Sequence, residues 1–167
     1  MKNSILALLI SSALMSFSEA NRPEHELHAM MVYNFIRYIE WPSSGQEFTI
    51  GVIGDESVFS TLHQWYDGKL KGGKTFRVVM FNSVADVQKC NIIYMGNQSK
   101  AKLTSVTKKL EDQSTLLITN KPGYGKLGSG INFTTEGNKL RFELNQQAVK
   151  AAGLKVSSQL TAIAILL

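Results

Sequence analysis

Apolar residues along this chain follow two alternating patterns. Short apolar runs, which are typical of buried strands, lie at Phe48–Ile53, Thr75–Phe81, Asn91–Met95 and Thr115–Thr119. Between these runs, apolar residues recur at helical spacing after Asp55, as far as Gly68, and again from Ser99 to Glu111. Strands that alternate with helices predict a parallel sheet with helices packed on its faces.

The first predicted helix begins at Pro23-Glu24 and runs to about Glu40. Proline is tolerated in a first helical turn, and the residue before Pro42 is pushed out of helical backbone geometry. The apolar residues of this segment cover more than one narrow stripe. They are Leu27, Met30, Met31, Val32, Phe35, Ile36 and Ile39. The helix is therefore expected either to be buried on two sides or to offer one side to a partner.

The C-terminal part of the chain predicts an antiparallel hairpin, with two strands joined by a Gly137-Asn138 turn. The first strand contains Ile131–Thr134. In the second strand, apolar and polar residues alternate: Leu140, Phe142 and Leu144 alternate with Arg141, Glu143 and Asn145. The apolar set is expected to face the core and the polar set to face away from it.

Shorter segments complete the predicted order of elements. Ser83–Lys89 is expected to be a connection with one or two helical turns. After the hairpin, a short helix should end at Gly153, and a final helix capped by Ser157 or Ser158 should run through Ile165. The whole pattern predicts a three-layer α/β sandwich with a mixed, mainly parallel sheet of the Rossmann or flavodoxin kind and a terminal antiparallel hairpin.

A glycine-rich loop tests whether a nucleotide cofactor is expected. Gly123–Gly128 matches the G-x-G-x-x-G pattern and follows a predicted strand. The pattern binds a pyrophosphate only where the last glycine opens a helix, and here the chain continues into the extended segment Ile131–Thr134. We therefore expect no cofactor, and a loop whose glycines allow positive φ.

The N-terminus has the features of an export signal. Lys2 precedes the largely apolar segment Ile5–Phe17, and Ser18-Glu19-Ala20 places small residues where a signal peptidase cleaves. At 13 residues the apolar run is short for a membrane span, which needs about 18 or more. The expectation is a signal peptide at residues 1–20, a single domain at 21–167 with no integral membrane segment after cleavage, and a periplasmic location.

Charge and cysteine content exclude several classes. The net charge is +5, but the lysines are scattered and no arginine-rich run contains aromatic residues, so nucleic acid is not an expected partner. Cys90 is the single cysteine, so no internal disulfide is possible, and its place before an apolar strand predicts burial. His25 and His28 have the spacing of a metal pair, but no third ligand follows at a suitable distance. We expect no metal and solvated histidines.

Several segments, in this order and spacing, resemble the YfiR family of bacterial periplasmic proteins. The matching segments are Tyr33–Pro42, Phe48–Gly54, Cys90–Tyr94, Gly130–Phe133, Arg141–Asn145 and Ala152–Ser158. Two positions depart from the family pattern. Gly51 stands where relatives commonly have cysteine, and Gly128-Ser129-Gly130 replaces the Gly-Gly pair often found before the Ile-Asn-Phe strand. The first departure puts disulfide-based sensing in doubt for this chain.

The resemblance implies a regulatory binding protein without catalysis. Well-known members act as repressors in cyclic di-GMP signalling. They bind the periplasmic part of an inner-membrane diguanylate cyclase and hold it inactive until envelope or redox stress releases it. Dimers are also known in the family, so a homodimer is a second expectation. The alternative is an envelope small-ligand-binding protein, or a weak enzyme, that uses a cleft at the Asn120–Gly130 loop.

Two sets of residues are candidates for these functions. The first set, for a protein partner, is Tyr33, Arg37, Glu40 and Trp41, because aromatic residues and arginine contribute most of the energy at interfaces. The second set, for a ligand or a partner, is Asn120, Arg141, Glu143 and Asn145. In an enzyme, Glu143 would act as acid or base and Arg141 would hold an anion. No nucleophile, base and orienting group occur together, which favours a protein that is not an enzyme.

Overall fold

The computed structural model describes residues 22–42, 45–137 and 139–167. Its helices are α1 (Glu24–Ile36), α2 (Glu56–Tyr66), α3 (Lys100–Lys109), α4 (Gln146–Ala151) and α5 (Ser158–Ile163), with a short 3₁₀ turn η1 (Gly125–Leu127). Its strands are β1 (Ile39–Glu40), β2 (Glu47–Ile53), β3 (Leu70–Lys71), β4 (Lys74–Phe81), β5 (Ile92–Met95), β6 (Leu116–Thr119), β7 (Ile131–Glu136), β8 (Lys139–Leu144), β9 (Lys155–Val156) and β10 (Ile165–Leu166).

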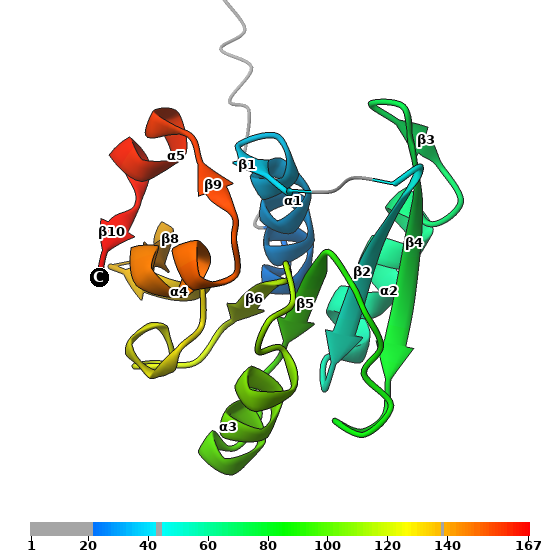
Figure 1. The fold of residues 1–167 in the computed structure, drawn as a ribbon. Coiled ribbons are helices and arrows are strands. Elements are labelled where there is room, and N and C mark those ends of the chain that lie inside the picture. The colour runs from blue at the N-terminus through cyan, green and yellow to red at the C-terminus, as the bar shows by residue number, and fades with distance from the viewer. Residues whose placement is uncertain (1–21, 43–44, 138) are drawn as a thin grey trace, which may run out of the picture.

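Within the described residues, these strands form one large sheet and one small ribbon. The large sheet has the order β10-β8-β7-β6-β5-β2-β4-β3, and β1 pairs separately with β9. The central strands β4, β2, β5, β6 and β7 are parallel, and Figure 1 shows β2, β4 and β5 pointing the same way. β7 and β8 form the antiparallel hairpin. The predicted fold class, a mixed and mainly parallel α/β sandwich with a terminal hairpin, is confirmed.

Helices cover both faces of this sheet and enclose two apolar clusters. On one face, α1 and α2 contribute Val32, Phe35 and Leu62 to a cluster with the inward residues of β2, β4, β5, β6, β7 and β8. On the other face, Leu103 and Val106 of α3 pack with the alternate residues of β2, β5 and β6. Because successive strand residues point to opposite faces, the continuous apolar runs of β5 and β6 supply both clusters.

The first helix is shorter than the sequence predicts. α1 ends at Ile36, and Ile39 and Glu40 form a strand instead, paired with Val156 and Lys155. The backbone N–H of Ser157 donates to the carbonyl of Tyr38, 2.9 Å away, and extends this pairing. The prediction of a helix to about Glu40 is wrong because β9, far along the chain, offers backbone partners that local periodicity cannot reveal.

Two other segments also differ from prediction. Ser83–Lys89 contains turns and no helix, because the Asp86 carboxylate accepts hydrogen bonds from both the backbone N–H and the hydroxyl of Ser83, at 3.0 and 2.7 Å. The final helix ends at Ile163, and β10 then pairs with β8 in parallel, Ile165 beside Glu143. The exposed edge of β8 has unpaired backbone groups, and the end of the chain satisfies some of them.

The predicted helix caps are confirmed. The Asp55 carboxylate accepts a hydrogen bond from the N–H of Val58 at the start of α2, and the Ser157 hydroxyl accepts one from Leu160 at the start of α5. Gly137 of the hairpin turn has φ +61°, and its predicted partner Asn138 lies outside the described residues. None of the described helices is long and apolar enough to cross a membrane.

Candidate functional site

Gln98 lies at the crevice where open α/β sheets usually bind ligands. This crevice lies at the carboxyl ends of β2 and β5, where the chain leaves the sheet in opposite directions. The Gln98 side chain packs so closely on Gly54 that a Cβ at Gly54 would lie 1.9 Å from Gln98 Nε2. The Gln98 carbonyl accepts hydrogen bonds from the Tyr124 hydroxyl at 2.7 Å and from Lys121 Nζ at 3.3 Å. Gln98 thus joins the end of β2 to the glycine-rich loop.

The glycine-rich loop has no phosphate-binding helix, as predicted. Its residues form η1 and then lead into β7, and Gly123 and Gly128 have φ +82° and +107°. Below the loop, the fully buried Asn132 joins three segments. Its Oδ1 accepts hydrogen bonds from the Thr119 hydroxyl at 2.7 Å and from the N–H of Lys121 at 3.2 Å. Its Nδ2 donates to Glu143 Oε2 at 2.8 Å.

The second candidate set does not form one site. Asn145 caps α4 by accepting from the N–H of Ala148, and its Nδ2 donates to the Gly125 carbonyl at 2.8 Å. Arg141 Nε lies 3.7 Å from a Glu136 carboxylate oxygen on the hairpin. The fourth residue, Asn120, lines a different pocket, beside the first turn of α1. Of the set, Glu143 and Asn145 therefore hold the loop in place.

The first candidate set lies where α1 ends and β1 begins, and we call it the α1–β1 surface (Tyr33, Arg37, Glu40 and Trp41). Arg37 and Glu40 are exposed, whereas Tyr33 is half-buried. The Tyr33 ring stacks on Tyr66 with 4.5 Å between ring centroids, and Lys71 Nζ lies 5.1 Å from the Tyr33 centroid. The exposed side chains of this surface are therefore those of Arg37 and Glu40.

Trp41 is a structural residue as well as a candidate contact. Its Nε1 donates to the Asn91 carbonyl at 3.1 Å, and its ring meets the Phe48 ring edge-on with 5.0 Å between centroids. These contacts tie the chain after β1 to β2 and to the start of β5. The half-buried ring leaves only part of its area for a partner.

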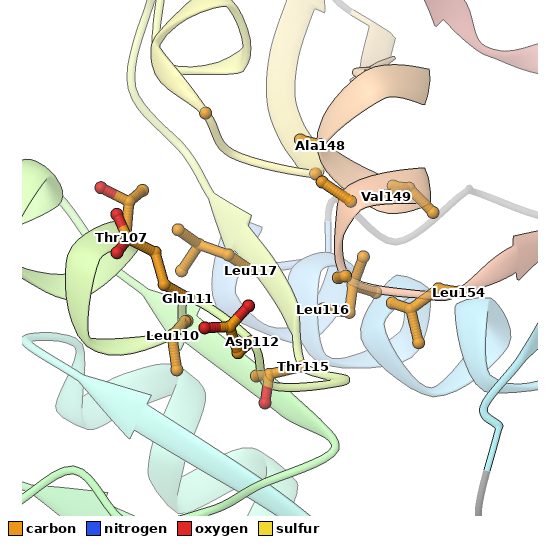
Figure 2. Close-up of a pocket in the computed structure, with 14 residues that line it drawn as sticks. Thr107, Leu110, Glu111, Asp112, Thr115, Leu116, Leu117, Ala148, Val149 and Leu154 are labelled. Carbon is orange, nitrogen blue, oxygen red and sulfur yellow. The ribbon is translucent and has the colours of Figure 1, made fainter.

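A cavity of about 460 Å³ lies between α3 and α4, over the first residues of β6. Figure 2 shows Leu116, Val149 and Leu154 on one side of it and Leu110 and Leu117 on the other. Gly128 and Gly130, at the end of the predicted loop, also border it. Its ionisable lining groups are the carboxylates of Glu111 and Asp112. The lining of the cavity is thus mainly apolar.

His28 forms a buried polar chain that sequence reasoning missed. It is 2% exposed, its ring stacks on Phe133 with 4.3 Å between centroids, and its Nδ1 lies 2.9 Å from the Tyr94 hydroxyl. The Tyr94 hydroxyl donates a long hydrogen bond, 3.5 Å, to Asp55 Oδ2. Burial lowers the pKa of His28, and burial together with the Asp55 carboxylate raises the pKa of Tyr94. Both rings are therefore neutral at pH 7.

The expectation of solvated histidines was wrong for His28. A signal was present in the sequence, because His28 lies four residues before Val32 and seven before Phe35, on the stripe that α1 buries. Within the described ranges, no group of three or more His, Cys, Asp or Glu residues could hold a metal ion. Cys90 is buried as predicted, and burial raises the pKa of its thiol to about 11, which leaves little thiolate at pH 7.

The buried state of His28 predicts a pH dependence of stability. Burial lowers its pKa in the folded protein, although Glu24 and Asp55 raise it and His25 lowers it further. As the pH falls, His28 is therefore protonated at a higher pH in the unfolded chain than in the folded protein. As pH falls below about 6.5, the free energy of unfolding should fall, by at most about 1.4 kcal/mol per pH unit from this group, until the folded pKa is reached. Denaturant titrations at pH 7.5 and 5.0 measure this.

The variant His28→Gln should show a smaller loss between these two pH values than the wild type. His63→Gln is the matched control, since the His63 side chain is 52% exposed. An equal loss in the wild type and in both variants would show that His28 does not titrate differently in the folded and unfolded states.

Solved structures share this fold. The chain is similar to a conserved domain protein from Vibrio cholerae O1 biovar El Tor strain N16961, with TM-score 0.56, 12% identity, and coverage of 86% of this chain and 60% of that one. It is also similar to an ABC domain in complex with L-Trp from Streptococcus pneumoniae, with TM-score 0.56, 7% identity, and coverage of 85% and 59%. The chain thus spans about 60% of the length of both structures.

A family model supports a closer relationship over most of the chain. The family described as DUF4154, YfiR/HmsC-like, matches residues 25–165. The match runs from the first turn of α1 to the first residue of β10, so it includes the α1–β1 surface, the hairpin and the loop held by Asn132. The protein belongs to the YfiR/HmsC-like family.

Proposed function

We propose that this protein is a periplasmic regulator that binds the exported part of an inner-membrane signalling protein, such as a diguanylate cyclase, and holds it inactive. The observation that carries the proposal is the family match over residues 25–165. Export requires a signal, and residues 1–20, which lie outside the described residues, have the sequence features of one. The domain after them, residues 21–167, would be the regulatory unit.

Regulation by contact needs a rigid surface with accessible groups, and the α1–β1 surface supplies one. Arg37 and Glu40 are exposed at the end of a helix that is buried through Val32 and Phe35, and β9 pairs with the strand that carries Glu40. Fixed charges at a firm position give orientation and specificity to a protein interface. Binding would stabilise the inactive state of the partner by the difference in affinity between its two states.

The state of the other polar residues favours binding over catalysis. Glu143 accepts a hydrogen bond from Asn132, and Asn145 caps α4, so both have structural partners. The Cys90 thiol is buried and has a raised pKa, which suits neither a nucleophile nor a redox sensor. These observations support a regulator that acts by binding a partner through its surface.

Capture of the partner from an envelope extract tests the proposal. Immobilised wild-type protein should retain an inner-membrane protein with an exported domain, and Arg37→Glu should weaken this binding about tenfold or more, because interface arginines are frequent hot spots. Arg77→Glu is the matched control. Arg77 is exposed on β4, where the neighbouring Phe76 and Val78 face the α1 side and Arg77 therefore faces the other.

The comparison of the two arginine variants decides the location of the interface. If Arg77→Glu weakens capture as much as Arg37→Glu does, net charge rather than the α1–β1 surface governs binding. If neither variant changes a specific, saturable capture, the surface lies elsewhere. If the wild type retains no membrane protein, the regulatory proposal fails.

A further inference from the structure

A small pocket opens beside the first turn of α1, at the carboxyl end of β6. Its volume is about 230 Å³, and its lining includes Glu24, His28, Asn120, Phe133, Thr135 and Leu140. Two of its polar atoms, His28 Nε2 and Asn120 Oδ1, are buried and have no hydrogen-bond partner within the described part of the protein. A buried polar atom without a partner costs stability, so two of them at one pocket point to a ligand.

The hydrogen-bond chain behind His28 determines what its free nitrogen offers. The Asp55 carboxylate only accepts hydrogen bonds, so the Tyr94 hydroxyl donates to it. The Tyr94 oxygen then accepts from Nδ1–H of His28. With the Tyr94 proton directed to Asp55, the histidine proton lies on Nδ1, and Nε2 is a lone-pair acceptor at the pocket.

Two more acceptors belong to residues that line the same pocket. Glu24 Oε1 lies 3.5 Å from His28 Nε2, and its side chain is 77% exposed at the mouth. Asn120 Oδ1 is the other. Among the described residues, no lysine or arginine lines the pocket, so an anionic ligand would meet a carboxylate and none of their positive charges.

We propose that this pocket binds a small molecule through its primary ammonium group. An ammonium group has three N–H donors and no acceptor, which matches His28 Nε2, Asn120 Oδ1 and the Glu24 carboxylate. Pro122 and Leu140 would contact a short hydrocarbon chain next to it. The volume is about that of eight waters in the liquid, which suits a chain of a few carbon atoms.

This site is separate from the proposed partner surface. The pocket adjoins the first turn of α1, whereas Arg37 follows its last turn, and 13 helical residues rise by about 20 Å. Binding of an amine therefore does not depend on the regulatory proposal, and each can fail without the other.

Titration of the purified full chain with n-butylamine at pH 7.5 tests the inference, with ¹H–¹⁵N NMR of the histidine rings as readout. We expect saturable binding that shifts the His28 Nε2 signal and leaves the exposed His63 unchanged. Asn120→Leu should weaken binding about tenfold, and Glu24→Gln about threefold because this carboxylate is exposed. Glu26→Gln, in the same turn, is the matched control and should bind like the wild type.

The Asn120→Leu variant also separates loss of binding from loss of folding. It removes a buried polar atom without a partner, so its melting temperature without ligand should equal or exceed that of the wild type. Three results would overturn the inference: equal binding of 1-butanol, binding of Zn²⁺ at His28 with no response to the amine, and no saturable shift at all. The last would mean that the pocket holds only water.

Discussion

Replacing Asn132 by alanine is expected to lower the free energy of unfolding by about 3 kcal/mol. The side chain is fully buried and makes three hydrogen bonds, with Thr119, Lys121 and Glu143. Its loss leaves a hydroxyl, a backbone N–H and a carboxylate without this partner at the base of the glycine-rich loop. Urea unfolding at pH 7, followed by circular dichroism, measures the change.

The exposed Asn34 provides a matched control for this substitution. Asn34→Ala on α1 removes the same atoms from a solvated position and should change the free energy of unfolding by less than about 0.5 kcal/mol. Leucine at position 132 fills more of the space but restores no hydrogen bond, so Asn132→Leu should also be strongly destabilised. A loss below about 1 kcal/mol in Asn132→Ala would show that the three bonds are not what holds the loop.

Replacing Trp41 by alanine is also expected to lower the free energy of unfolding by about 3 kcal/mol. The indole ring packs edge-on against Phe48, and its N–H donates to the carbonyl of Asn91. Alanine removes both contacts and opens space beside β2. Thermal and urea unfolding give the stability, and the amide hydrogen exchange of β1 and β2 shows whether the damage is local.

The graded variant Trp41→Phe separates the two contributions. Phenylalanine keeps an aromatic ring beside Phe48 but lacks the N–H, so it should lose only about 1 kcal/mol. Equal stability of the wild type and Trp41→Ala would show that the contacts of the ring with Phe48 and Asn91 do not stabilise the fold. The ring would then be available to bind a partner. Because the alanine variant is expected to be unstable, Arg37 rather than Trp41 is the proper position for binding experiments.

Most of the fold could be predicted from the sequence because it depends on local patterns. The short apolar run Asn91–Met95 favours a core strand, and Asp55 stands where a helix cap is needed. The errors occur where distant backbone partners decide. Glu40 pairs with Lys155, and Ile165 pairs with Glu143. Both residues are therefore in strands, although the sequence predicts helices there.

Less of the candidate site could be predicted. The alternation on β8 correctly predicts that Arg141 and Glu143 lie on one face. It does not reveal that Asn132 of the neighbouring strand β7 donates a hydrogen bond to Glu143 beneath the glycine-rich loop. His28 was hidden for a different reason. It is buried against Phe133, which is more than a hundred residues away in the sequence. Because histidine is polar, it was expected to be solvated, although its position falls on the buried stripe of α1.

The level of cyclic di-GMP in the host bacterium tests the central claim most directly. Deletion of the gene should raise this level, and expression of the wild-type chain should restore it. The Arg37→Glu variant, and a chain without residues 1–20, should fail to restore it. An unchanged level after deletion would contradict inhibition of a diguanylate cyclase, and full restoration by the chain without residues 1–20 would contradict action outside the inner membrane.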